Sequence, residues 1–199
     1  MHVGTRVAPP DPLRIPLSEP EWQALRGRLC RPPAVAGDSM NVMTLLQELR
    51  EARRELLAAV EGLRPSEALT EKEWTVHDLL GHIAAWDREV LAALQERQAG
   101  RDRYELEGYQ DDDRWNAVVR ARKAELAPEQ VRMDFLMIRR EVEDLLRETY
   151  SEVGATTAPI HVSWLGDTTV DELVRSTSIT HDREHAAQVR AWRESRRPL

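Results

Sequence analysis

Residues 74–90 read WTVHDLLGHIAAWDREV and have the pattern of an amphipathic helix. Apolar side chains recur every three or four positions, as expected of one face of a helix with 3.6 residues per turn. This face comprises Val76, Leu79, Leu80, Ile83, Trp86, Val90 and, just beyond the quoted stretch, Leu94. Thr75 precedes it and Asp78 follows three residues later, a close variant of the capping box that begins helices. The pattern predicts a helix from Thr75 to about Gln98, with His82 on or beside its buried face.

Three further segments share this periodicity. The first begins at Met40, the second begins at Pro128, and the third runs from about Thr169 to Ser195. Long amphipathic helices bury their apolar faces against one another. The sequence therefore predicts an all-α fold, a four-helix bundle.

The connections in this bundle are expected to be long and irregular. One covers residues 100–113 and leads into a short helical piece over 114–126, and another covers 151–167. Only Ile160–Leu165 contains a β-forming run, and it is short, so no strand is predicted.

The first 39 residues differ from the rest of the chain. They hold seven of the eleven prolines, and no long helix can pass through so many prolines. We therefore treat 1–39 as an irregular, Pro-rich N-terminal extension, with one short helix around Glu21–Leu29, and 40–199 as the bundle domain.

Composition and charge argue against several classes of function. The net charge of −7 is the wrong sign for a nucleic-acid partner, because phosphate backbones need a basic surface. No apolar run reaches the roughly 18 residues of a membrane span, and the N-terminus lacks the apolar stretch of a signal peptide. The single cysteine, Cys30, cannot form an internal disulfide. These features predict a cytoplasmic protein with no membrane partner.

Residues 181–185, HDREH, hold two histidines four positions apart. On a helix, His181 and His185 share one face, which is the spacing that gives two imidazoles to one metal ion. The letters also match the H-x-x-E-H signature of inverted zinc proteases. That chemistry needs a further ligand, and the only acid after His185 is Glu194 on the same helix, so a peptidase is disfavoured.

The second and last predicted helices resemble each other. Both begin with Thr-Val-x-acid-Leu, at 75 and 169, and both contain Asp-Arg-Glu, at 87–89 and 182–184. This echo suggests related places in the bundle. If the two helices pack together, His82 completes a three-histidine site with His181 and His185. The alternative is that His82 is a hydrogen-bonded core histidine and that the other two touch water at the bundle edge.

Three stretches, in this order, resemble the DinB-like (damage-inducible) superfamily of four-helix bundles over about residues 40–196. They are WTVHDLLGHIAAWDREV (74–90), DDDRWNAVVRARKAELAPEQV (111–131) and THDREHAAQVRAW (180–192). The superfamily includes mycothiol- and bacillithiol-dependent enzymes and a group named after colibactin resistance. The resemblance implies a metal triad of one histidine on the second helix and two on the last, here His82, His181 and His185.

The resemblance also implies cofactors and partners. The metal would be divalent, Zn²⁺ or Ni²⁺ first, with Fe or Mn as alternatives, because neutral imidazole suits several of these ions. Thiol-dependent relatives add a low-molecular-weight thiol and act on a small electrophilic molecule. Members of the superfamily often form homodimers, so the resemblance implies a homodimer here. Trp86 and Asn116 match the family pattern and are candidates for cofactor contact, with Trp86 either a pocket wall or a core residue.

We therefore expect a metal-dependent enzyme, either a thiol S-transferase or isomerase or a hydrolase. Asp87 and Glu184 are weak catalytic candidates, as acceptors for the metal-binding histidines or as a base, and each could equally be a surface acid. The alternative is a non-catalytic, stress-related or small-molecule-binding bundle, with a pocket lined by Trp86 and Trp192.

Overall fold

The structure is a computed structural model that describes residues 42–69, 74–150 and 155–196. The N-terminal extension lies outside these residues, so the short helix predicted around Glu21–Leu29 stays a prediction. Within the described residues, the chain forms the predicted four-helix bundle.

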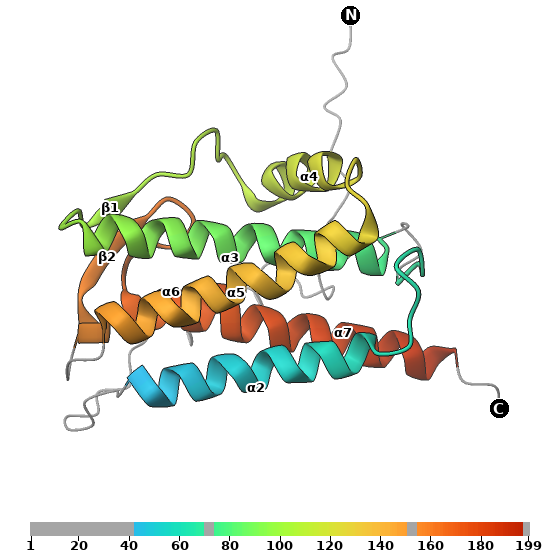
Figure 1. Cartoon of the computed structure of the whole chain (residues 1–199). Helices are drawn as coiled ribbons and strands as arrows, with labels where there is room; N and C mark the ends of the chain where they lie inside the picture. Colours follow the sequence, from blue (N-terminus) through green and yellow to red (C-terminus); the bar gives the residue numbers. More distant parts are fainter. Residues whose placement is uncertain (1–41, 70–73, 151–154, 197–199) are drawn as a thin grey trace, which may run out of the picture.

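Three helices of the bundle are continuous: α2 (Val42–Val60), α3 (Val76–Gln98) and α5 (Pro128–Thr149). In Figure 1 the sequence colours show that α2 and the last helix run in one direction, and that α3 and α5 run in the opposite one. The closest neighbours are α3 with α5 and α2 with the last helix, so each of these pairs is parallel.

A parallel pair cannot be joined by a tight turn. A helix of the length of α3 extends about 35 Å, and the chain must travel back along it before α5 can begin. Residues 99–127 make this return and contain a short helix, α4 (Asp112–Lys123), which packs on α3. The long connection and the helical piece predicted here are confirmed.

The last helix is built from three consecutive pieces: α6 (Val170–Val174), η2 (Arg175–Thr180) and α7 (His181–Ser195). The middle piece is π-helical, a wider turn that occurs mostly as short insertions in α-helices and often at functional sites. It ends directly before His181. The helix therefore changes its winding at the residue that the sequence marked as a metal ligand.

Both helices that share the Thr-Val-x-acid-Leu pattern begin at its threonine. The Thr75 side chain accepts a hydrogen bond from the backbone N–H of Asp78, and Asp78 completes the capping box. The Thr169 side chain accepts one from the backbone N–H of Glu172. Each cap satisfies an N–H group that has no partner within its own helix.

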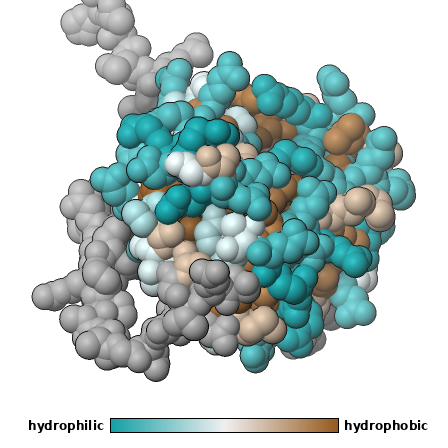
Figure 2. Space-filling model, turned by 60° about the vertical axis from the view of Figure 1, so that its left-hand side comes forward, coloured by the Kyte–Doolittle hydropathy of each residue, from teal (hydrophilic) through white to brown (hydrophobic). Residues whose placement is uncertain are grey.

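The core lies between the four helices. Every apolar position predicted for the buried face of α3 is less than a tenth exposed. Phe135 on α5 is fully buried and is one of the largest side chains in the core. Figure 2 shows that hydrophilic side chains cover most of one outer face, with hydrophobic side chains dispersed among them.

Within the described residues, no helix combines the length and hydrophobicity needed to span a bilayer.

A small sheet corrects the prediction that the chain has no strand. Its three strands lie in the order β1 (Arg103–Tyr104), β2 (Pro159–Val162) and β3 (Gly166–Thr169). Strand β1 is parallel to β2, and β3 is antiparallel to it. Strands this short carry no usable periodicity, and β1 pairs with residues far along the chain. The sheet joins the two long connections at one end of the bundle (Figure 1).

Truncating Phe135 tests the core. We expect Phe135→Ala to lower the free energy of unfolding by about 3–5 kcal/mol, because a large ring is lost from a closed interior. The matched control is Met137→Ala on the same helix. Met137 is 54% exposed, and its truncation should change stability by no more than about 0.5 kcal/mol. Urea denaturation followed by circular dichroism measures both, and equal effects would contradict this packing.

Candidate metal centre

The structure brings three histidines together that are up to about one hundred residues apart in the chain. The Nε2 atom of His181 lies 2.9 Å from the Nε2 atom of His82 and 2.9 Å from that of His185. His82 comes from α3, and the other two come from α7. His82 and His185 are buried, and His181 is half-buried.

This arrangement suits a cation better than it suits three neutral rings. The Oε1 atom of Gln188 accepts a hydrogen bond at 2.8 Å from Nδ1 of His185, which leaves a lone pair on the Nε2 atom of that ring. His181 could donate a proton from Nε2 to one neighbour only. A metal ion would accept all three lone pairs. At a metal–nitrogen distance of about 2.0–2.1 Å, nitrogens 2.9 Å apart subtend about 90° at the ion, which leaves room for further ligands.

The protein holds these rings in the neutral form that binds metal. Burial lowers the pKa of His82 well below its ordinary range, and the neighbouring His185 lowers it further, while Asn116 opposes the shift. Burial likewise lowers the pKa of His181, and the charges of His185 and His82 add to this effect. Because a protonated imidazole cannot be a ligand, these shifts would keep His82 and His181 available to a metal ion at mildly acidic pH.

Aromatic side chains surround Trp86, one helical turn after His82. The ring centroids of Tyr109, Trp115 and Trp164 lie 5.7 to 6.5 Å from that of Trp86, and all three rings stand edge-on to it. Trp86 is buried, and its indole Nε1 donates a hydrogen bond to Oδ1 of Asn116 at 3.1 Å. Trp86 is therefore the centre of an aromatic cluster.

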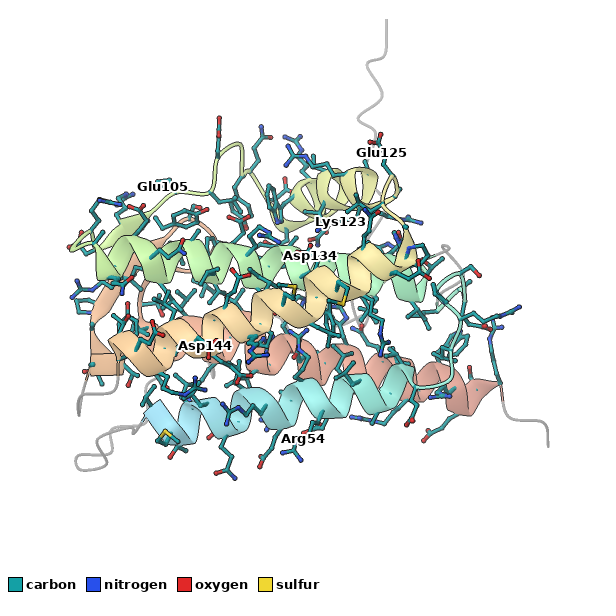
Figure 3. The ribbon with its side chains drawn as sticks, viewed as in Figure 1. Arg54, Glu105, Lys123, Glu125, Asp134 and Asp144 are labelled. Atoms are coloured by element: carbon teal, nitrogen blue, oxygen red, sulfur yellow. The ribbon has the colours of Figure 1, made fainter. Side chains whose placement is uncertain are left out.

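Helix α4 carries Asn116 and is held against the first half of α3. Arg120 pairs with Asp78 at 3.3 Å. Lys123 pairs with Asp134 of α5, and both residues are labelled in Figure 3. Gly81 permits this close approach, because a Cβ atom there would lie 3.1 Å from Cγ of Lys123. These contacts place the Asn116 amide beside both His82 and Trp86.

Asp87, one of the two weak catalytic candidates, lies in a buried ion network. Its Oδ1 and Oδ2 atoms accept hydrogen bonds from Arg139 at 2.8 and 3.0 Å, and Oδ2 accepts another from Arg53 at 2.5 Å. Ser178 donates a further one to Oδ1 at 2.8 Å. Burial would raise the pKa of Asp87, but the guanidinium groups of Arg139 and Arg53 outweigh burial and lower it. Asp87 thus stays ionised, and both of its carboxylate oxygens are hydrogen-bonded.

Asp182 is the second acid of this network. Its Oδ2 atom lies 3.0 Å from Nε of Arg53 and 3.3 Å from Nη2 of Arg139. Burial raises the pKa of Asp182, and the two arginines oppose that shift. We call Arg53, Asp87, Arg139 and Asp182 the charge tetrad. Each member comes from a different helix of the bundle, and each is less than a tenth exposed.

The remaining candidates are Glu184, Trp192 and Trp86. Glu184 is on an exposed face of α7, where partial desolvation raises its pKa. Trp192 lies two turns after His185 and stacks with Arg196 at 4.8 Å, whereas Trp86 belongs to the aromatic cluster. The aromatic rings of Trp86 and Trp192 therefore belong to separate groups of contacts.

The tetrad was missed in the sequence, although a signal for it exists. Arg139 follows Phe135 by four positions and precedes Val142 by three, so it occupies the apolar face of its helix. Arg53 lies between Leu49 and Leu56 on α2 in the same way. Charged residues on an apolar face need buried partners of opposite charge, and that requirement points to acids on other helices.

Fold and site together define a helical bundle with a candidate three-histidine metal centre. The DinB superfamily family model matches residues 39–189, and the chain belongs to this superfamily. The crystal structure of an uncharacterised protein from Escherichia coli UTI89 has the same fold, with a TM-score of 0.62 and 13% sequence identity. The match covers 80% of this chain and 96% of that one. No curated protein matches the sequence.

The lowered histidine pKa values predict a pH dependence of the metal-free protein. Below about pH 6.5 the unfolded chain binds protons on His82 and His181, whereas the folded chain does not. Stability should therefore fall as the pH drops from 6.5, by up to about 1.4 kcal/mol per pH unit for each histidine. Urea denaturation in chelator at several pH values measures this slope.

A pair of variants isolates the histidine contribution. His181→Gln should flatten the slope between pH 6.5 and 5, because its proton uptake on unfolding is lost. His161→Gln is the control, since His161 is partly exposed and pairs with Asp167 at 2.7 Å on the small sheet. A slope that is the same in wild type and His181→Gln would contradict the neutral state of this ring at these pH values.

Proposed function

We propose that this protein binds one divalent metal ion through His82, His181 and His185, and that it uses the ion to transfer a thiol to a small electrophilic molecule. The observation that carries the proposal is the convergence of three Nε2 atoms, with two separations of 2.9 Å. Three neutral ligands leave the charge of the ion uncompensated, which favours an anionic further ligand. A thiolate is such a ligand.

A divalent ion in this site would supply Lewis acidity, which lowers the pKa of a coordinated thiol or water and polarises an electrophile. The protein's own side chains would orient the histidines and exclude water from the site. Gln188 fixes the proton of His185 on Nδ1, and Asn116 places an amide beside His82. The aromatic cluster around Trp86 provides an apolar wall.

Thiol transfer is favoured over hydrolysis by what surrounds the histidines. Activating water requires a base within reach, and the two acids considered for this role are placed elsewhere. Asp87 is held by two arginines, and Glu184 is on an exposed face of α7. The described residues contain no cysteine, so none of them supplies the thiol nucleophile, and we propose that it comes from a second molecule.

One observation supports the alternative of a non-catalytic, small-molecule-binding bundle. A groove of about 390 Å³ between α2 and α5 is lined by residues other than the histidines. They are Arg50, Arg53, Phe135, Leu136, Arg139, Arg140, Glu143, Asp144 and Arg147. A protein that only binds molecules in this groove would have no need of a metal.

Metal content separates the two functions. We expect protein purified without chelator to contain about one zinc or nickel ion per chain, as measured by inductively coupled plasma mass spectrometry. His181→Ala should lose at least about nine-tenths of it, because a ligand is removed. His161→Ala, which removes a surface histidine, should keep it. Negligible metal in wild type and His181→Ala alike would overturn the enzyme proposal.

Thermal stability with added thiols tests the substrate class. Mycothiol, bacillithiol or glutathione at about a hundred times its dissociation constant should add about 2.7 kcal/mol to the stability of the metal-loaded protein. The same thiol should have no effect on metal-free protein or on His181→Ala. Stabilisation that does not depend on metal, or none with any thiol, would count against thiol transfer.

A further inference from the structure

We propose that the charge tetrad is the positioning element of the three-histidine site. It fixes α7 against α3, and so it places His181 and His185 opposite His82. This inference rests on the proposed metal site and adds the residues that hold its two halves together. The tetrad members are positioning residues, since they act through the histidines and the helices that carry them.

Metal ligands and tetrad members are close neighbours in the sequence. Asp182 directly follows His181, and Asp87 follows His82 by five positions, about 7.5 Å along α3. The two helices that supply the ligands therefore also supply both carboxylates of the tetrad. Any slide or rotation of α7 against α3 moves the ligands and the carboxylates together.

The last helix packs on α3 through α6 and η2, before the ligand-bearing segment begins. The main packing partner of α3 is α5, and that of α7 is α2, while α7 itself scarcely approaches α3 along its backbone, so side chains join α3 to α7. Arg139 comes from α5 and Arg53 from α2. Each arginine lies between Asp87 on α3 and Asp182 on α7, within 3.3 Å of both.

The geometry of these contacts is directional. Arg139 binds both oxygens of Asp87 through Nε and Nη2, the planar arrangement that constrains orientation as well as distance. Ser178, three residues before His181 in the π-helical segment, donates to the same carboxylate. One carboxylate on α3 is thereby tied to α2, to α5 and to the last helix beside the metal ligand.

Stability alone does not account for a buried ion network. Apolar side chains of similar volume commonly stabilise a protein interior as well as such a network does, because charges lose their hydration on burial. Apolar packing, however, tolerates small slides between helices, whereas bidentate ion pairs do not. A site whose three ligands come from two helices requires a fixed distance between them.

Cobalt binding tests this role. Co²⁺ replaces zinc or nickel in imidazole sites and gives visible absorption bands that depend on ligand number and geometry. Arg139→Lys keeps the charge but loses the bidentate contact, and Ser178→Ala removes a single hydrogen bond to Asp87. We expect Arg139→Lys to weaken Co²⁺ binding about 10- to 100-fold, as for other groups that support metal ligands, and Ser178→Ala to weaken it less. Both should shift the bands of the Co²⁺-saturated protein.

The matched control is Arg50→Lys. Arg50 pairs with Glu143 at 2.7 Å and joins the same two helices, α2 and α5, but its side chain is 46% exposed. This variant should bind Co²⁺ with the wild-type affinity and spectrum. Circular dichroism verifies folding, and if Arg139→Lys does not fold, Ser178→Ala decides.

The outcomes separate the two proposals. Wild-type protein that binds no Co²⁺ would overturn the proposed metal site itself. If wild type binds Co²⁺ and the folded tetrad variants bind it with unchanged affinity and spectrum, the positioning role is overturned while the metal site stands. Weaker binding with an unchanged spectrum at saturation would indicate general destabilisation, and it would also overturn the positioning role.

Discussion

The ion pair between Arg139 and Asp87 joins α5 to α3 in the interior of the bundle, and most other features of the site depend on it. Neither charge could be buried alone, because losing hydration without a partner is too costly. Arg53 and Asp182 complete a neutral set, with one charge from each helix. This requirement restricts how the helices can slide against one another, which apolar packing alone would not do.

Next to the charge tetrad in the sequence are three imidazoles rather than further charged side chains. His181 adjoins Asp182 in sequence, and the π-helical turn ends between Thr180 and His181. Neutral rings are compatible with burial, and their lowered pKa values keep them neutral. The site thus combines the charge tetrad, whose charges balance and which holds the helices, with three neighbouring imidazoles whose lone pairs can accept a cation. The thiol chemistry that we propose uses the imidazoles only.

Much of the fold follows from local pattern. Thr75 and Thr169 mark helix starts because their hydroxyls can accept an N–H that is otherwise unpaired, and the apolar stripe from Val76 to Leu94 indicates the buried face. The histidine spacing at 181 and 185 was likewise visible, because residues four apart share a helix face. The likeness of the second and last helices suggested His82 as their partner, and the family resemblance implied the same residue.

The features that sequence did not predict depend on contacts between distant segments. The strand Arg103–Tyr104 is too short for any periodic signal and exists because residues 159–162 lie beside it. The tetrad joins residues from four helices, and Asp87 and Asp182 look like surface acids until their helices are placed. Only Arg53 and Arg139 indicated the tetrad in the sequence, since each interrupts the apolar face of its helix.

We propose above all that three imidazole nitrogens bind one metal ion. X-ray absorption spectroscopy of the metal-loaded protein tests it most directly. We expect three imidazole ligands at about 2.0–2.1 Å, and an additional sulfur ligand at about 2.3 Å after a thiol is added. A spectrum without imidazole scattering, or one that His181→Ala leaves unchanged, would contradict it.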